Sequence, residues 1–245
     1  HVLRRDYPDL DVARARVILI EATDRLLAAM PTGLQRKAHD QLRALCVDVR
    51  LGALVTDVSE DAVTLRGGET IGSSNVGWVT GTRGAPLAAA MGLDVAPDGR
   101  IPVGRTLQLG GRPEAYAIGD ITVLQGPDGR PYPMLAQVAL QQGDLAARNI
   151  LRAVRGEPPL RFRYRDRGTM ATIGRRMAVA HIFGLQFSGS FAWALWLVVH
   201  LLAIIGLRNR ALVLLNWTWN YVRYDRASRL VTDDISRGGR VVPRH

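Results

Sequence analysis

Two short motifs, with a Pro-containing loop between them, constrain the fold of this chain more than any other feature. Tyr116–Asp120 reads YAIGD, the pattern of a short apolar strand that ends in Gly-Asp. Ala136–Gly143 reads AQVALQQG and opens a segment whose apolar residues recur at helical spacing up to Val154. A strand, a loop and a helix in this order predict an α/β fold.

The chemistry of the first motif indicates a bound molecule with a chain of hydroxyl groups. The carboxylate of Asp120, at a strand end, can accept hydrogen bonds from such hydroxyls. Gly119 has no side chain, so the ligand can approach the backbone closely. Together with the helix that opens at Ala136, this is the layout of a flavin site. The alternative is that Asp120 only caps a turn.

A continuous apolar run, 15–21, predicts a buried parallel strand closed by Glu21. An acid that ends the second strand of a dinucleotide-binding βαβ unit bonds a ribose hydroxyl. The glycine-rich loop of such a unit lies roughly twenty residues or more upstream of the acid. The twenty residues before Glu21 contain no glycine. We therefore expect that the chain begins inside a dinucleotide-binding domain; the alternative is a different fold, in which Glu21 is an acid at a helix N-terminus.

The remaining elements follow from periodicity and from turn residues. We expect helices at 24–27, 32–45, 87–91 and 136–154. We expect strands at 47–49, 53–58, 61–65, 69–71, 76–81, 101–103 and 107–109, and a strand-like segment at 162–164. A hairpin is expected from 170–173 and 177–182 about Gly174, and two apolar helices from 191–207 and 212–221.

The net charge of +10 is concentrated around one uncharged segment. Residues 148–176 hold 9 basic and 2 acidic side chains, 177–207 hold no Asp, Glu, Lys or Arg, and 208–245 hold 8 basic and 3 acidic ones. Basic flanks around a Trp-rich apolar stretch favour an anionic membrane surface over nucleic acid. A solvated basic face beside a buried helix is the alternative. The apolar run of 17 residues at 191–207 is shorter than a bilayer-spanning helix of about 20 residues.

Six segments, in order, carry a resemblance to a known family. They are VILIEATDRLL at 17–27, WVTG at 78–81, YAIGD, AQVALQQG, GTMATIGRRMAVA at 168–180 and IGLRNRALVLLNWTWNYV at 205–222. The chain resembles the C-terminal portion of type II NADH dehydrogenases, in the pyridine nucleotide-disulfide oxidoreductase superfamily. At Val79 and Thr80 the family usually has alanines.

The resemblance implies an α/β fold with two dinucleotide-binding domains, for FAD and NAD, truncated at the N-terminus. Residues 1–84 would be the second half of the NADH-binding domain, and 85–160 the C-terminal half of the FAD-binding domain. Residues 161–245 would form a helical membrane-association region. A chain cut in this way is expected to be inactive alone.

The same resemblance implies a role for each candidate site residue. Six would bind cofactors: Glu21 and Gly81 would contact NADH, while Gly119, Asp120, Ala136 and Gln137 would contact FAD. Gln141 and Gln142 would lie at the quinone. Ordinary structural roles are the alternatives: a turn glycine at Gly81, and solvent-facing glutamines on a surface helix.

The activity implied is electron transfer from NADH through FAD to a membrane quinone, without proton pumping and without a protein nucleophile or acid–base group. The resemblance further implies a homodimer, peripheral on the cytoplasmic face of the bacterial inner membrane, with no nucleic-acid partner. No metal-ligand spacing is found, and the single Cys46 excludes an intramolecular disulfide. The alternatives are a related ferredoxin or disulfide reductase, which would lack the Trp-rich tail, and a non-enzymatic membrane-surface protein on a degenerate flavoprotein fold.

Overall fold

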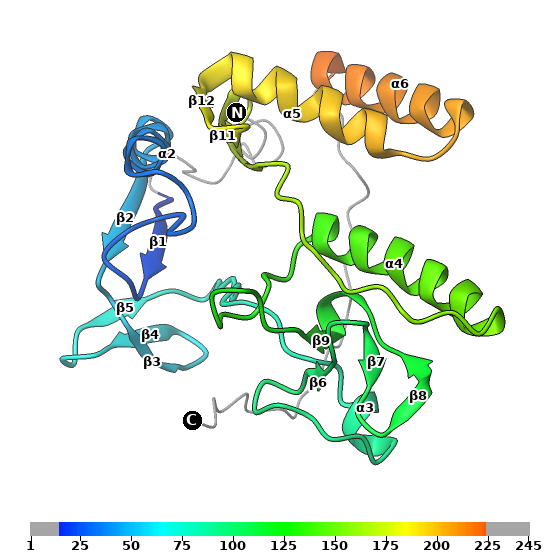
Figure 1. Ribbon diagram of the computed structural model, residues 1–245. Coiled ribbons are helices and arrows are strands. Elements are labelled where there is room, and N and C mark those ends of the chain that lie inside the picture. The colour runs from blue at the N-terminus through cyan, green and yellow to red at the C-terminus, as the bar shows by residue number, and fades with distance from the viewer. Residues whose placement is uncertain (1–14, 224–245) are drawn as a thin grey trace. The chain divides into compact units, whose positions relative to one another are not determined.

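The computed structural model describes residues 15–223, and the chain divides into two compact units. Within the described residues, the first unit contains 15–76 and 168–223, and the second contains 77–167. The first unit therefore joins segments from both ends of the described chain (Figure 1).

The first unit opens with a βαβ arrangement. Strand β1 (Val17–Glu21) pairs in parallel with β2 (Val47–Leu51), and helix α2 (Thr32–Ala44) connects them. The parallel pairing and the strand end at Glu21 agree with the sequence prediction, but the predicted burial was wrong: Val17 is exposed and the other residues of β1 are half-buried. The expected helix at 24–27 is not formed: this segment consists of bends and turns, and Leu27 adopts a positive φ of 51°.

Antiparallel strands make up the rest of the β structure in this unit. The strands β3 (Val55–Val58), β4 (Ala62–Leu65) and β5 (Thr70–Gly72) form a meander. A second sheet contains β10 (Thr169–Gly174), β11 (Met177–Ile182) and β12 (Leu185–Ser188). Its first two strands form the hairpin that the sequence predicted about Gly174.

Small residues on β11 allow helices to pack against both of its faces. Val179 is fully buried with Leu34 and Ala38 of α2. Ala178 and Ala180 lie on the opposite face, fully buried with Ala192 of α5 (Gly189–Ala203). Alternate residues of a strand point to opposite faces, so one strand serves both packings.

Two helices follow this sheet as a hairpin, α5 and α6 (Leu207–Arg223) (Figure 1). Their indole and phenol rings hold them together: the Trp196 and Trp217 ring centroids are 6.1 Å apart, and those of Trp193 and Tyr221 are 5.8 Å apart. Arg210 closes the turn by donating to the carbonyls of Ile204 and Leu202, both at 2.8 Å. Within the described residues, no helix has the length and apolarity needed to cross a membrane.

The second unit is built on one long helix. Helix α4 (Ala136–Val154) has the bounds that the sequence predicted, and its apolar face packs on Leu107, Leu124 and Phe162. The short elements beside it are α3 (Leu87–Ala90), the parallel pair β6 (Ile101–Pro102) and β9 (Thr122–Val123), the antiparallel pair β7 (Gln108–Leu109) and β8 (Arg112–Tyr116), and the 3₁₀ turn η2 (Gly119–Ile121).

Three local expectations in this unit were wrong. Residues 76–81 form no strand, and 162–164 form an extended segment outside any sheet. The strand of the first motif ends at Tyr116, so Gly119 and Asp120 lie in the 3₁₀ turn that follows instead of at the strand end. Gly119 has a φ of +79°, a left-handed conformation that glycine adopts without strain.

Candidate functional site

The two motifs of the second unit lie against each other. The Gly119 N–H donates to Oε1 of Gln142 at 2.6 Å, which ties the 3₁₀ turn to α4. A Cβ placed on Gly119 would lie 3.6 Å from that of Ala139, and one on Gly143 would lie 3.6 Å from Cδ1 of Ile118. Two glycines that face each other's element therefore allow the turn and the helix to approach closely.

The 3₁₀ turn presents its acidic residue to solvent. Thr122 Oγ1 donates to the Gly119 carbonyl at 2.8 Å and fixes the far side of the turn. Asp120 itself is exposed. The cap residue of α4, Leu135, makes no side-chain cap, and there is no acid in the first turn of the helix. The exposed carboxylate offers acceptors to a polar ligand, and the helix N-terminus without a side-chain cap offers donors.

These features fit a flavin nucleotide on its ribityl and ring side. Asp120 can accept from hydroxyl groups, Gly119 leaves room beside the backbone, and the helix start at Ala136 offers N–H groups and a positive dipole end. Gln137 lies in the same helical turn as Ala136. The four residues thus supply the kinds of contact that the chemistry needs.

The glutamines of α4 contact the backbone of the segment after the helix. Gln141 Oε1 accepts from the Arg165 N–H at 2.9 Å, and its Nε2 donates to the Arg165 carbonyl at 3.0 Å. Gln137 Oε1 accepts from the Arg167 N–H at 3.1 Å. Gln142 is 2% exposed, and its oxygen is occupied by Gly119. Gln137 and Gln141 therefore share one face of the helix, while Gln142 points inward.

Asn149 is a buried polar residue of α4 that could not be singled out by motif. It is fully buried, donates to the carbonyls of Thr106 and Leu160 at 3.0 Å, and accepts from the Leu160 N–H at 2.8 Å. In the sequence, Asn149 lies four residues after Leu145 on the apolar face of α4, and this position could have predicted its burial. A polar side chain on a buried helix face indicates a local hydrogen-bond network.

Glu21 lies in the first unit, at the end of β1. Its Oε1 accepts from the Thr23 N–H at 2.8 Å and from Thr23 Oγ1 at 2.9 Å. Arg25 forms a two-bond ion pair with Asp24, at 2.6 and 2.8 Å, which lowers the pKa of Asp24. Arg25 is therefore committed to a carboxylate other than Glu21.

Gly81, in the second unit, is exposed and has a φ of +106° with nothing within 4 Å of a Cβ placed on it. Beside it, Thr82 Oγ1 donates to Sδ of Met134 at 3.1 Å, in the loop before α4. The positive φ requires a glycine here whatever the function of the residue.

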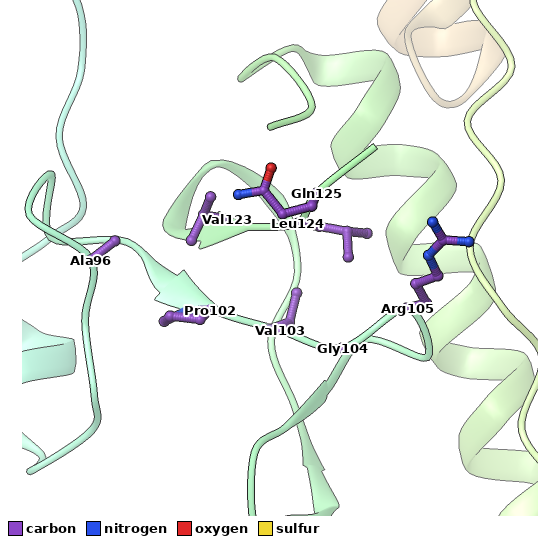
Figure 2. Close-up of a pocket in the computed structure, with 8 residues that line it drawn as sticks. All are labelled: Ala96, Pro102, Val103, Gly104, Arg105, Val123, Leu124 and Gln125. Carbon is purple, nitrogen blue, oxygen red and sulfur yellow. The ribbon is translucent and has the colours of Figure 1, made fainter. Parts of the chain in front are cut away.

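A pocket of about 470 Å³ lies elsewhere in the second unit, at the ends of β6 and β9 (Figure 2). Its walls are mostly apolar, with Arg105 and Gln125 as the polar side chains. None of the candidate residues from the sequence lines it. The described residues contain no cluster of His, Cys, Asp and Glu that could hold a metal ion.

Comparison with models of protein families identifies the family of this chain. The model of the pyridine nucleotide-disulphide oxidoreductase family matches residues 10–143, more than half of the chain. The chain belongs to this family. The model of the NDH2 C-terminal domain matches residues 167–223, which include the hairpin α5–α6. The resemblance to type II NADH dehydrogenases is thereby confirmed.

Known proteins support the same placement in the pyridine nucleotide-disulphide oxidoreductase family. Type II NADH:quinone oxidoreductase Ndh of Mycobacterium tuberculosis is 33% identical over 244 residues, which cover 95% of this chain and 52% of that protein. The Haemophilus influenzae type II NADH:quinone oxidoreductase is 28% identical over 193 residues, 76% of this chain and 44% of that protein. The chain thus spans about half the length of the curated relatives it matches.

Solved structures show the same fold. NDH2 of Plasmodium falciparum, in complex with NADH, aligns with a TM-score of 0.76 at 15% identity, over 89% of this chain and 60% of that one. The sulfide:quinone oxidoreductase of Aquifex aeolicus aligns with a TM-score of 0.57 at 16% identity, over 79% of this chain and 50% of that one. The α/β fold of the family is therefore shown for this chain.

Proposed function

We propose that this chain is part of a type II NADH:quinone oxidoreductase, which transfers electrons from NADH through FAD to a membrane quinone without pumping protons. The contact between Gly119 and α4 carries the proposal. It brings the turn that holds Asp120 against the helix that begins at Ala136, so the two motifs lie together. The family match and the names of the relatives support the same activity.

In this proposal the second unit holds the flavin. Asp120 accepts hydrogen bonds from the ribityl hydroxyls, and Gly119 leaves room for the ribityl chain. The N-terminal end of α4, at Ala136 and Gln137, would face the flavin ring, where the helix dipole would stabilise negative charge. A bound FAD would supply the chemistry that takes an electron pair from NADH and delivers it to the quinone.

In the first unit, Glu21 accepts a hydrogen bond from the adenosine ribose of NADH. Its charge also repels a 2′-phosphate, which favours NADH over NADPH. The ion pair of Arg25 with Asp24 supports this preference, because it keeps the nearby guanidinium occupied. Gly81 allows the nicotinamide dinucleotide to pass close to the backbone.

We place the quinone beside Gln141, whose amide can donate to a quinone carbonyl. Its two hydrogen bonds to Arg165 are exposed, so they can exchange for bonds to a ligand. Gln142 acts indirectly. Its side-chain oxygen accepts from the Gly119 N–H and thereby fixes the turn that carries Asp120.

We place the protein on the cytoplasmic face of the bacterial inner membrane, as a peripheral homodimer attached through the hairpin α5–α6. The tip of this hairpin exposes Ile205 and Leu207 at 87% and 81%, and Phe191 and Trp219 are also exposed. Apolar side chains and indoles on such helices are suited to the interface of a bilayer.

The test measures NADH oxidation by the complete gene product, with a short-chain quinone and with ferricyanide as a water-soluble acceptor. Gln141→Ala removes one hydrogen bond to the quinone, so we expect kcat/KM for quinone to fall about tenfold. Activity with ferricyanide should stay at the wild-type level. Val154→Ala, at an exposed position of the same helix, is the control. Absence of NADH-dependent quinone reduction in the wild type would overturn the proposal.

A further inference from the structure

Four arginines occupy alternate positions after α4; inward-facing aromatic residues separate the first three, and the exposed Asp166 lies between the last two. Arg161, Arg163, Arg165 and Arg167, here called the arginine ridge, are all exposed. Phe162 is buried and Tyr164 is half-buried between them. Alternate residues of an extended chain point to opposite sides, so the four guanidinium groups project from one side.

The aromatic residues fix the inner side of this segment to the second unit. The ring of Tyr132 meets that of Phe162 edge-on, with centroids 5.4 Å apart, and that of Tyr164 at 5.7 Å. Phe162 belongs to the same buried cluster as Leu107 and Leu145. The arginines are therefore turned outward by the packing of their neighbours.

Three amides of α4 hold the backbone of the segment along its length. Asn149 makes two hydrogen bonds to the backbone of Leu160, Gln141 makes two to Arg165, and Gln137 accepts one from Arg167. Figure 1 shows this segment running alongside α4. Because the backbone is already ordered, binding through the arginines costs little further conformational entropy of the chain.

The segment 161–167 holds four arginines and one acid, Asp166, so it is basic overall. Within the described residues, none of its four arginines forms an ion pair, whereas Arg148 and Arg152 of α4 pair with Asp144 and Glu157. The acid of the segment, Asp166, accepts a hydrogen bond from the Tyr164 hydroxyl at 3.4 Å. At about 3.3 Å per residue, four arginines at alternate positions form a row roughly 20 Å long.

We propose that the arginine ridge binds the headgroups of anionic lipids at the surface of a bilayer. The inference deepens the proposed function and rests on its membrane attachment. Guanidinium groups form paired hydrogen bonds with phosphate, and a row of them suits a planar anionic surface. The uncharged stretch 177–207, which follows in the chain, contains the apolar helix α5.

A lipid surface fits the ridge better than nucleic acid. Proteins that bind single strands stack the bases on exposed aromatic rings. Phe162 and Tyr164 instead face inward, onto Tyr132. The ridge presents charge alone, which matches the sequence-independent attraction between basic segments and anionic leaflets.

The test measures partition of the complete gene product onto phosphatidylcholine vesicles with and without phosphatidylglycerol. The variant Arg161→Gln/Arg163→Gln should bind the anionic vesicles about 30-fold more weakly at low salt, since each arginine near such a surface contributes about fivefold. Its binding to neutral vesicles should equal that of the wild type. Arg112→Gln/Arg130→Gln removes the same charge from exposed positions of the same unit and should lose less than about threefold.

Arg161→Lys/Arg163→Lys loses the paired hydrogen bonds to phosphate but keeps the charge, which supplies most of the attraction to an anionic leaflet, so it should bind within about threefold of the wild type. Equal losses in the ridge and control variants, or equal losses in the Gln and Lys variants, would overturn the proposal. Preferential binding to duplex DNA at matched phosphate concentration would also overturn it. A wild-type chain that binds neither kind of vesicle would instead contradict the proposed membrane attachment.

Discussion

Gln142 shows how one side chain decides the geometry of the candidate site. It is buried, and its oxygen is the acceptor for the Gly119 N–H. Gln142→Leu keeps the volume but leaves that N–H without its partner. We expect the free energy of unfolding to fall by about 1–3 kcal/mol, measured by denaturant titration.

The matched control is Leu140→Gln, at a position that is 72% exposed on the same helix. It should change the free energy of unfolding by less than about 0.5 kcal/mol. Equal effects in the two variants would show that Gln142 contributes no more than an ordinary surface residue.

The pKa of Tyr164 reports on the packing of the segment that carries the arginine ridge. Burial, followed by the negative charge of Asp166, raises the pKa of Tyr164 to about 12. The unfolded chain ionises this phenol near pH 10, so the contribution of Tyr164 to stability is complete below pH 10 and is lost as the pH rises towards 12.

Difference titration of phenolate absorbance between wild type and Tyr164→Phe measures this directly. The wild type should show one additional late-titrating phenol, and its stability should fall more steeply with alkaline pH than that of the variant. A Tyr164 phenol that titrates with the ordinary pKa would contradict the packing on Tyr132.

At the scale of elements, α4 acts as a support for the segment 160–167. Gln141→Ala removes two hydrogen bonds to the Arg165 backbone. Local opening of the segment should become about tenfold more frequent. Trypsin should then cleave after Arg163 and Arg165 faster by a similar factor, measured by mass spectrometry of the peptides.

Cleavage in the first unit supplies the internal control. Arg36 and Arg43 lie on exposed positions of α2, and cleavage there should keep its wild-type rate. Faster cleavage at these sites as well would indicate general unfolding and not a local role of Gln141.

The hairpin of β10 and β11 depends on one glycine. Gly168 has a φ of +100°, and a Cβ placed on it would overlap the His181 carbonyl oxygen. Gly168→Ala should lower stability by more than about 2 kcal/mol and speed hydrogen exchange across Thr169–Ile182. Gly110→Ala, where a Cβ meets open space, should leave exchange in this hairpin unchanged.

The elements with strong periodicity could be predicted from the sequence. α4 and α2 show helical spacing over several turns, and the bounds of α4 were predicted correctly. The strand at 76–81 was wrong because a short apolar run between glycines lacks the pairing partner that would make it a strand. For the site, the motifs predicted that Gly119 and α4 belong together; the inward direction of Gln142 depends on tertiary packing.

At the scale of the whole molecule, the first unit joins residues far apart in the chain. β11 packs between α2 and α5 only because Ala178, Val179 and Ala180 are small enough for close approach on both faces. Such a pairing could not be predicted from local pattern, since neither helix carries a signal for its partner. The division into two units likewise follows from contacts between distant segments.

We propose that this chain carries the flavin- and quinone-facing part of an NADH:quinone oxidoreductase. The most direct measurement follows the flavin absorbance of the complete gene product under anaerobic conditions. We predict that NADH bleaches the flavin band and that a subsequent addition of quinone restores it. Bleaching by NADH without recovery on adding quinone, or the absence of bleaching by NADH, would contradict the account.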